Sequence, residues 1–202
     1  MGMFFGGAIK KKVHIKPSPI KGENIETEID ISIKEAFEGI EKKISISSLT
    51  EKNKILDVKI PSGIKSGEKI KLEGQGKLGK NGGKNGDLII KINIKNSSTY
   101  RLQDSDIYVN LLITPWDAAL GSRASVNGID GDVTIIVPKG TQNGDKISIP
   151  NKGYYIKDQQ RGNLIIKTEI VIPKKLTDKE KALFTELKKI SNFKPNDIVD
   201  IK

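Results

Sequence analysis

An internal repeat constrains the fold of this chain more than any other feature, because two copies of one sequence pattern predict two copies of one structural unit. Three blocks of the first half return in the same order in the second half, at spacings of about 82, 77 and 76 residues. Lys34–Gly39 returns as Trp116–Gly121, Pro61–Ile70 as Pro138–Ile147, and Asn85–Lys91 as Arg161–Lys167. The chain is therefore expected to contain two tandem units. The first of these blocks is expected to be a short helix or turn that ends on glycine.

Most of each unit alternates apolar and polar residues with a period of two, which predicts strands that have one apolar face. Clusters of Gly, Asn, Asp and Pro separate these runs. Asp130-Gly131 is expected to form a tight hairpin turn, because this dipeptide tolerates the positive φ angles that such a turn needs. The predicted strands are Glu28–Ile33, Lys43–Ile46, Leu56–Ile60, Lys69–Leu72, Leu88–Ile94, Ile107–Ile113, Ala124–Ile129, Asp132–Val137, Lys146–Ile149 and Leu164–Ile172. The predicted fold is mainly β, with two tandem β-sandwich-like domains followed by a short C-terminal helix.

The C-terminal helix is predicted from its first turn. Thr177 and Glu180 fit a capping box, in which the Thr177 hydroxyl accepts from the Glu180 amide and the Glu180 side chain reaches back. Pro195 is expected to end the helix. One face of the helix carries its apolar residues, which are Ala182, Leu183, Leu187 and Ile190, with Phe184 beside them. A helix this short is marginal alone and needs a partner surface, either its own second unit or a second copy of the chain.

Lysine dominates the charge of the chain. Its 202 residues include 35 Lys and Arg against 25 Asp and Glu, a formal net charge of +10. This excess predicts an acidic partner, such as nucleic acid, an acidic membrane surface or an acidic peptide tail. Only Arg101, Arg123 and Arg161 are arginines, which counts against nucleic acid because base-edge and bidentate phosphate recognition favour the guanidinium group. Compositional bias of the source genome is the alternative explanation.

Composition and motifs also disfavour several classes of protein. The absence of Cys removes disulfide frameworks and thiolate metal sites and suits the cytoplasm. No apolar run approaches the ~18 residues of a membrane span, and no export signal opens the chain. His14 is the only histidine and is expected to be solvated, so a two-His metal site is impossible. Gly74–Asn81 lacks the final hydroxyl residue of a phosphate loop, and a flexible loop between strands is the better interpretation. The chain is predicted to be no enzyme and to need no cofactor.

The residues alone suggest one binding surface. Lys42 and Lys43 open the predicted strand at Ile44–Ile46, and the alternating segment Thr27–Ile31 precedes it. If these strands pair at a sheet edge, their apolar side chains form a shallow groove that has lysines at its rim. Such a groove would accept an extended peptide by strand addition. The alternative is an ordinary sandwich core with solvated lysines.

The repeated blocks resemble the C-terminal substrate-binding region of DnaJ-like J-domain co-chaperones, in the class without a zinc-binding domain. The resemblance runs from about Glu23 to Ile190, and five blocks in the right order carry it. They are Ile31–Gly39, Pro115–Gly121, Pro138–Gly144, Arg161–Leu164 and Ile172–Thr177. Met3–Gly7 is similar to the end of the family's Gly/Phe-rich linker. The resemblance implies that residues 1–21 end this linker, 22–98 form a first β-domain with a peptide groove, 99–174 form a second β-domain, and 175–202 form a dimerisation helix and tail.

The resemblance also implies a function. The residues that correspond to the family's peptide-binding site are Ile29, Lys42, Lys43, Ile44, Ile46 and Ile90. The two lysines stand where some members hold the acidic tail of the partner chaperone. The implied activity is that of a cytoplasmic, stress-responsive co-chaperone, which binds extended apolar segments of unfolded proteins and delivers them to a DnaK-type chaperone. No His-Pro-Asp tripeptide occurs. The chain is therefore expected to be a fragment or stand-alone C-terminal region that does not stimulate the partner's ATPase.

For the C-terminal helix, the resemblance implies a two-fold dimer. The dimerisation residues would be Leu183, Phe184, Leu187 and Ile190. No membrane partner is expected, and nucleic acid is disfavoured as a partner. A basic β-domain that binds nucleic acid is nevertheless the alternative function. The two functions differ in a direct test, because binding to nucleic acid weakens steeply as salt is added.

Overall fold

The computed structural model describes residues 18–48, 51–157 and 160–198, and these fall into two compact units. The first unit takes in the described residues up to Val109 together with Ile149–Leu164. The second unit contains Asn110–Ser148 and the described residues from Ile165 onward. The first unit thus includes two segments of the second sequence repeat, one that ends at Val109 and one over Ile149–Leu164. The domain boundaries that follow the repeat stay a prediction.

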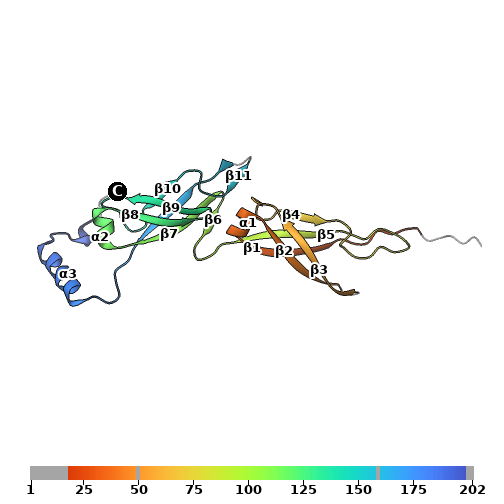
Figure 1. Cartoon of the computed structure of the whole chain (residues 1–202), viewed down its shortest axis with the longest axis horizontal. Coiled ribbons are helices and arrows are strands. Elements are labelled where there is room, and N and C mark those ends of the chain that lie inside the picture. Colours follow the sequence, from red (N-terminus) through yellow and green to blue (C-terminus); the bar gives the residue numbers. More distant parts are fainter. Residues whose placement is uncertain (1–17, 49–50, 158–159, 199–202) are drawn as a thin grey trace, which may run out of the picture. The chain divides into compact units, whose positions relative to one another are not determined.

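The first unit is built around a three-stranded sheet in the order β1-β5-β4 (Figure 1). β1 (Ile25–Ser32) runs parallel to β5 (Leu88–Lys95), and β4 (Lys69–Leu72) runs antiparallel to β5. A separate antiparallel ribbon consists of β2 (Ile40–Ser48) and β3 (Glu51–Ile60). The period-two pattern places one apolar face of each strand inward. The core strand residues that are almost completely buried include Val58, Ile60, Leu88, Ile90 and Ile92.

A short helix, α1 (Ile33–Glu38), joins β1 to β2. Its N-terminus is a capping box, because the Ser32 hydroxyl accepts from the Glu35 amide at 3.2 Å and the Glu35 carboxylate accepts from the Ser32 amide at 2.7 Å. The second of these hydrogen bonds lowers the pKa of Glu35. Gly39 ends the helix at a φ of 79°, a conformation that favours glycine. The predicted short helix that ends on glycine is therefore confirmed.

The second sequence repeat keeps the order strand, helix, two-stranded ribbon and two strands, and it adds the short strands β6, β11 and β12. Its main sheet has four strands in the order β10-β13-β7-β6, of which β6 and the start of β7 belong to the first unit. The elements are β6 (Arg101–Gln103), β7 (Asp106–Ile113), α2 (Pro115–Leu120), β8 (Ser122–Gly128), β9 (Gly131–Val137), β10 (Lys146–Ile149), β11 (Tyr155–Lys157), β12 (Gln160–Arg161) and β13 (Leu164–Ile170). β8 pairs with β9, and β11 pairs with β12. The prediction of a mainly β fold with two tandem β-sandwich-like domains is confirmed.

The β8–β9 hairpin turns one residue earlier than the sequence predicts. Gly128 pairs directly with Gly131, so the two turn residues are Ile129 and Asp130 rather than Asp130 and Gly131. The side chain of Ile129 is only 3% exposed. Burial of this apolar side chain fixes Ile129 in the turn and leaves Gly131, at a φ of 125°, as the first residue of β9.

The segment Gly74–Asn81 is a loop between β4 and β5, as expected, and it lies close to the chain before β1. Ile20 and Lys80 exchange two backbone hydrogen bonds of 3.0 and 2.9 Å. A Cβ atom at Gly83 would overlap the backbone of Ile20, and one at Gly86 would overlap the backbone of residues 22 and 23. The glycines therefore allow two backbone segments to approach each other closely. The phosphate-loop pattern in the sequence does not predict this role.

The C-terminal helix, α3 (Asp178–Ile190), begins at the predicted Thr177 capping box. The Glu180 carboxylate accepts from the Thr177 amide at 2.7 Å, and this hydrogen bond lowers the pKa of Glu180. The helix ends at Ser191, before Pro195, which instead begins a 3₁₀ turn over Pro195–Ile198. All residues of α3 are described, and none of them is buried.

Two predictions fall on residues outside the described part of the chain, namely those for His14 and for Met3–Gly7. Within the described part, none of the helices has the length and apolar character needed to cross a membrane. The same residues contain no group of three or more His, Cys, Asp or Glu side chains that could hold a metal ion.

Candidate functional site

Among the described residues, the strands of the first unit that have an edge without a neighbouring strand include β1 and β2. There β1 pairs only with β5, and β2 pairs only with β3. The Ile25 amide donates to the Asp87 carbonyl at 2.9 Å, which sets the hydrogen-bonding pattern of the parallel ladder. In such a ladder alternate residues bond to the same neighbour, so the backbone groups of Glu26, Glu28 and Asp30 point away from β5. β1 therefore presents an outer edge.

Lys42 connects this edge to β2. Its ammonium donates to the Asp30 carbonyl oxygen at 3.1 Å. Lys42 is half-buried and lies on the same face of the ribbon as Ile44 and Ile46, two and four residues further along β2. Lys43 lies on the other face, is exposed, and stands directly opposite Asp57 on β3. The two predicted lysines thus occupy different surroundings.

Three of the predicted apolar residues keep exposed surface. Ile29 on β1 and both Ile44 and Ile46 on β2 are half-buried. Ile90 is 0% exposed and lies between Thr27 and Ile70 in the sheet register. In this conformation Ile90 belongs to the core and offers no surface to a ligand. The Lys42 hydrogen bond joins β2 to β1. The peptide-binding role of these residues stays a prediction.

The acidic side chains of β1 each have a lysine partner on the neighbouring strands. The ion pairs are Glu26–Lys69 at 3.9 Å, Glu28–Lys91 at 2.9 Å and Asp30–Lys95 at 3.6 Å. The hydrogen bond from Lys91 lowers the pKa of Glu28. Among the described residues, no carboxylate forms a salt bridge with Lys42 or Lys43. An acidic ligand would therefore pair with either lysine without displacing an ion-paired carboxylate of the described residues.

Sequence analysis missed a buried carboxylate at the start of β5. Asp87 is 6% exposed, and its carboxylate lies 3.2 Å from the Lys21 ammonium and 3.3 Å from that of Lys71. It also accepts from the Gly74 amide at 3.0 Å. The Gly74 hydrogen bond, followed by that from Lys21, lowers the pKa of Asp87 to about 2. Asp87 thus ties the N-terminal segment and the glycine-rich loop to β4. Its place directly before a buried strand was the available signal.

An aromatic cluster in the first unit was also missed. Tyr154 is 2% exposed, and its hydroxyl donates to the Ile64 carbonyl at 2.6 Å. Burial raises the pKa of this hydroxyl. The ring of Tyr155 stacks on Phe37 at 4.8 Å between centroids, and the Arg161 guanidinium lies 4.7 Å from the centre of the Phe37 ring. Two adjacent tyrosines in a chain with 5% aromatic residues were the available signal.

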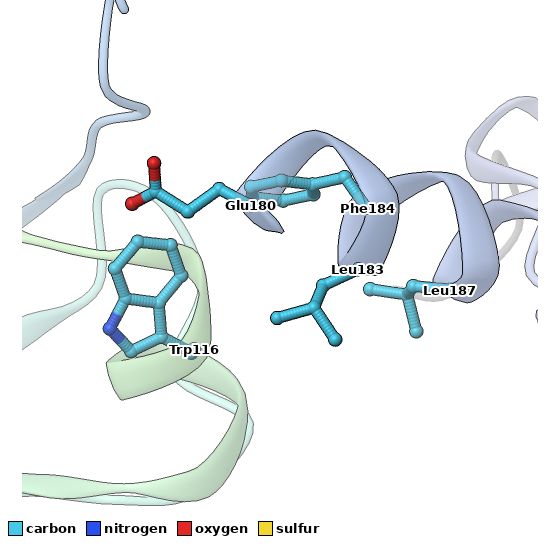
Figure 2. Close-up of a pocket in the computed structure, with 5 residues that line it drawn as sticks. All are labelled: Trp116, Glu180, Leu183, Phe184 and Leu187. Atoms are coloured by element: carbon cyan, nitrogen blue, oxygen red, sulfur yellow. The ribbon is translucent and has the colours of Figure 1, made fainter. Parts of the chain in front are cut away.

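The predicted dimerisation residues lie on α3, within the second unit. Phe184 is half-buried, and its ring centroid lies 6.4 Å from that of Trp116 on α2. Figure 2 shows the side chains of Leu183, Phe184 and Leu187 directed toward the space beside Trp116, where they line an apolar cavity of about 320 Å³ together with Glu180. Leu183 is 58% exposed, Leu187 is 56% exposed and Ile190 is 70% exposed. The Phe184–Trp116 pair joins the helix to its own unit, and most of the apolar face of the helix stays exposed.

Comparison with known families identifies the fold. The family described as DnaJ C terminal domain matches residues 25–173, which include the two repeats and the candidate site. The chain belongs to this family. The DnaJ C-terminal domain indicates a chaperone-type function, and the family is one of non-enzymatic co-chaperones.

Several curated relatives carry the name curved DNA-binding protein. The protein of this name from Pseudomonas putida is 30% identical over 200 residues, which cover 95% of this chain and 62% of the relative. The Coxiella burnetii protein is 30% identical over 184 residues, covering 87% of this chain and 58% of the relative. The Pseudomonas syringae protein is 30% identical over 200 residues, which cover 95% of this chain and 64% of the relative. This DnaJ C-terminal region therefore spans about three fifths of the length of these relatives.

Proposed function

We propose that the chain binds extended apolar segments of unfolded proteins at the β1–β2 site and passes them to a DnaK-type chaperone. The observation that carries this proposal is the open edge of β2, which lies beside half-exposed isoleucines and a lysine that bridges to β1. An unpaired strand edge supplies backbone hydrogen bonds to any extended peptide, whatever its sequence. That independence from sequence suits a protein that binds many unfolded clients.

The peptide pairs with β2 rather than with β1. The Lys42 ammonium already occupies the outward carbonyl of Asp30, so β1 is partly closed at that point. A peptide along β2 would direct alternate side chains toward Ile44 and Ile46, because side chains on a strand alternate between two faces. Ile29 would then contribute apolar surface from β1.

Apolar contacts and lysine contacts serve different purposes at this site. Fully burying one isoleucine-sized side chain contributes about 1.5–3 kcal/mol, whereas an exposed ion pair contributes about 0.2–1 kcal/mol and is screened by salt. The isoleucines therefore set affinity. Lys42 and Lys43 favour peptides with acidic residues beside the apolar ones, and they increase the association rate at low salt.

The test is the titration of a fluorescent peptide that has alternate apolar residues and an acidic end. Ile46→Ser is expected to weaken binding about tenfold at both low and high salt. The matched control is Ile55→Ser, because Ile55 is a 67% exposed isoleucine at the register position opposite Ser45 on the ribbon's other face. This control should leave binding unchanged. Circular dichroism confirms that both variants are folded.

A second pair of variants separates the lysines. Lys42→Ala is expected to weaken binding several-fold at low salt and little at high salt, and Lys43→Ala is expected to have the smaller effect because it lies on the opposite face. Equal loss of binding in Ile46→Ser and Ile55→Ser would contradict the proposed site. Unchanged binding in every variant would contradict it as well.

Nucleic acid binding is the second candidate function. It is favoured by the name of the relatives, curved DNA-binding protein, and by the formal charge of +10. Those relatives are longer than this chain, so their named property can reside in residues that have no counterpart here. The same titration with a mixed-sequence DNA duplex decides between the candidates. Tight duplex binding with a steep salt dependence, and no binding of the apolar peptide, would favour this second candidate.

We also propose that the chain forms a two-fold dimer through α3. The support is the uncovered apolar face that contains Leu183, Leu187 and Ile190. Two copies of this face would cover each other, and two peptide sites in one assembly would bind separate segments of one client with increased avidity.

A further inference from the structure

The base of the β2–β3 ribbon is tied together by two hydrogen bonds. The Ser62 hydroxyl donates to the Phe37 carbonyl at 2.6 Å, and the Gly63 amide donates to the Ala36 carbonyl at 2.8 Å. These bonds join α1, which leads into β2, to the loop Pro61–Ile64, which follows β3. Both ends of the β2–β3 ribbon are therefore joined at one place, which consists of α1 and the loop Pro61–Ile64 and is called the platform below.

Residues from later in the chain pack on this platform. The Tyr154 hydroxyl binds the carbonyl of Ile64, at the end of the loop. The Tyr155 ring covers Gly63, where a Cβ atom would lie 3.1 Å from the ring, and Gly63 has a φ of 78°. The same ring stacks on Phe37 with an interplanar angle of 16°. The cluster thus contacts α1 and the loop at the same time.

The cluster is itself held in place by backbone hydrogen bonds. The Tyr154 amide donates to the Ser105 carbonyl at 2.8 Å, and the Gly162 amide donates to the Tyr154 carbonyl at 2.8 Å. The Arg161 Nε group donates to the Gly153 carbonyl at 2.9 Å. The backbone of Tyr154 and the side chain of Arg161 are therefore both hydrogen-bonded to neighbouring segments of the same unit.

We propose that Tyr154, Tyr155 and Arg161 are positioning residues for the peptide site. By holding α1 and the loop Pro61–Ile64, they hold the ribbon at the angle that lets Lys42 reach Asp30 on β1. A two-stranded ribbon is marginally stable alone, so its orientation depends on what fixes its base. This inference rests on the proposed function for its effect on binding, but the effect on the ribbon can be measured without any peptide.

The test compares two variants that each delete one buried hydroxyl. Tyr154→Phe removes the hydrogen bond to Ile64 and keeps the ring. Thr168→Val is the matched control, because Thr168 is 0% exposed and its hydroxyl lies 2.9 Å from the Gln142 carbonyl in the second unit. Hydrogen exchange is followed at Gly63 and Gly39, whose amides donate to Ala36 and Glu35. The reference amides are their repeat equivalents, Gly140 and Gly121, which donate to Ala118 and Asp117.

In Tyr154→Phe, exchange at Gly63 and Gly39 is expected to increase about three- to tenfold relative to the reference amides, as loss of one buried hydrogen bond implies. Peptide affinity, from the titration described above, is expected to fall by a similar factor. Thr168→Val is expected to leave both the absolute exchange rates at Gly63 and Gly39 and the peptide affinity unchanged. Tyr155→Leu provides a second variant, with the same expected pattern, if Tyr154→Phe does not fold.

Three outcomes would overturn the proposal. They are unchanged relative exchange at Gly63 and Gly39, increased exchange with unchanged peptide affinity, and an equal loss of affinity in Thr168→Val. Failure of the proposed function is recognised separately, because the wild-type chain would then not bind the peptide at all. In that case the exchange measurement alone decides whether Tyr154 holds the base of the ribbon.

Discussion

The proposed dimer makes a quantitative prediction at Leu187. Leu187→Glu places a carboxylate on the uncovered face of α3 and keeps a residue that favours helix. Thr185→Glu is the matched control, because Thr185 is exposed and lies two residues away, on the opposite side of the helix. Each substitution introduces the same charge, so a difference between them reports the apolar face.

The expected effect follows from the exposure of Leu187. Full burial of a leucine side chain contributes about 1.5–3 kcal/mol, and Leu187 is 56% exposed, so covering it contributes about 0.8–1.7 kcal/mol. A two-fold interface contains the residue twice, which gives about 1.7–3.4 kcal/mol. At about 1.4 kcal/mol for each tenfold change, the dimer Kd should increase about 20- to 300-fold. Burial of the new carboxylate would add to this loss.

Sedimentation equilibrium over a range of concentrations measures the dimer Kd directly. The wild-type chain and Thr185→Glu should give the dimer mass at concentrations where Leu187→Glu gives the monomer mass. Helix content from circular dichroism controls for unfolding of α3. A monomer mass for the wild-type chain at every concentration, or the same Kd for both variants, would refute the reasoning.

Three further predictions concern stability. Asp87 has a pKa of about 2, so its ion pairs stabilise the first unit above about pH 4 and are lost as the pH falls toward 2. Asp87→Asn should therefore flatten the decrease of Tm between pH 4 and pH 2. Parallel Tm profiles of the variant and the wild-type chain would contradict this. Ile90→Val should lower the free energy of unfolding by about 0.5–1.5 kcal/mol without changing peptide affinity, because Ile90 is a core residue. Urea unfolding measures the free energy, and the peptide titration measures the affinity. Thr177→Ala should destabilise α3 by about 1 kcal/mol, seen as lower helix content, and unchanged content would exclude a role for the cap.

The regular elements of the fold were predictable because local patterns specify them. Strand alternation located both long strands of the first sheet, and the capping box located the first residue of α3. The strands that escaped prediction, β6, β11 and β12, have two or three residues each and are too short to show a period. The turn at Ile129 moved by one residue because a buried side chain outweighed the preference of Asp-Gly.

The candidate site was predictable in its composition but not in its geometry. Lys42 and Lys43 are neighbours in the sequence, yet strand alternation puts them on opposite faces, and only Lys42 reaches β1. Ile90 has the same residue type as Ile44, but its place in the central strand of the sheet buries it. Burial depends on which strands lie on either side, and a single sequence does not specify that order.

The two repeats differ most in what covers their short helices. In the first unit, Phe37 of α1 is 8% exposed because Tyr155 and Arg161 lie over it. In the second repeat the equivalent of Phe37 is Ala119, which is exposed. The outward positions of the two helices also differ in character, because α2 carries Trp116 and Leu120 where α1 carries the exposed Lys34 and Glu38. Because α3 adds exposed leucines beside α2 instead of covering it fully, the proposed dimer would bury apolar surface from both helices.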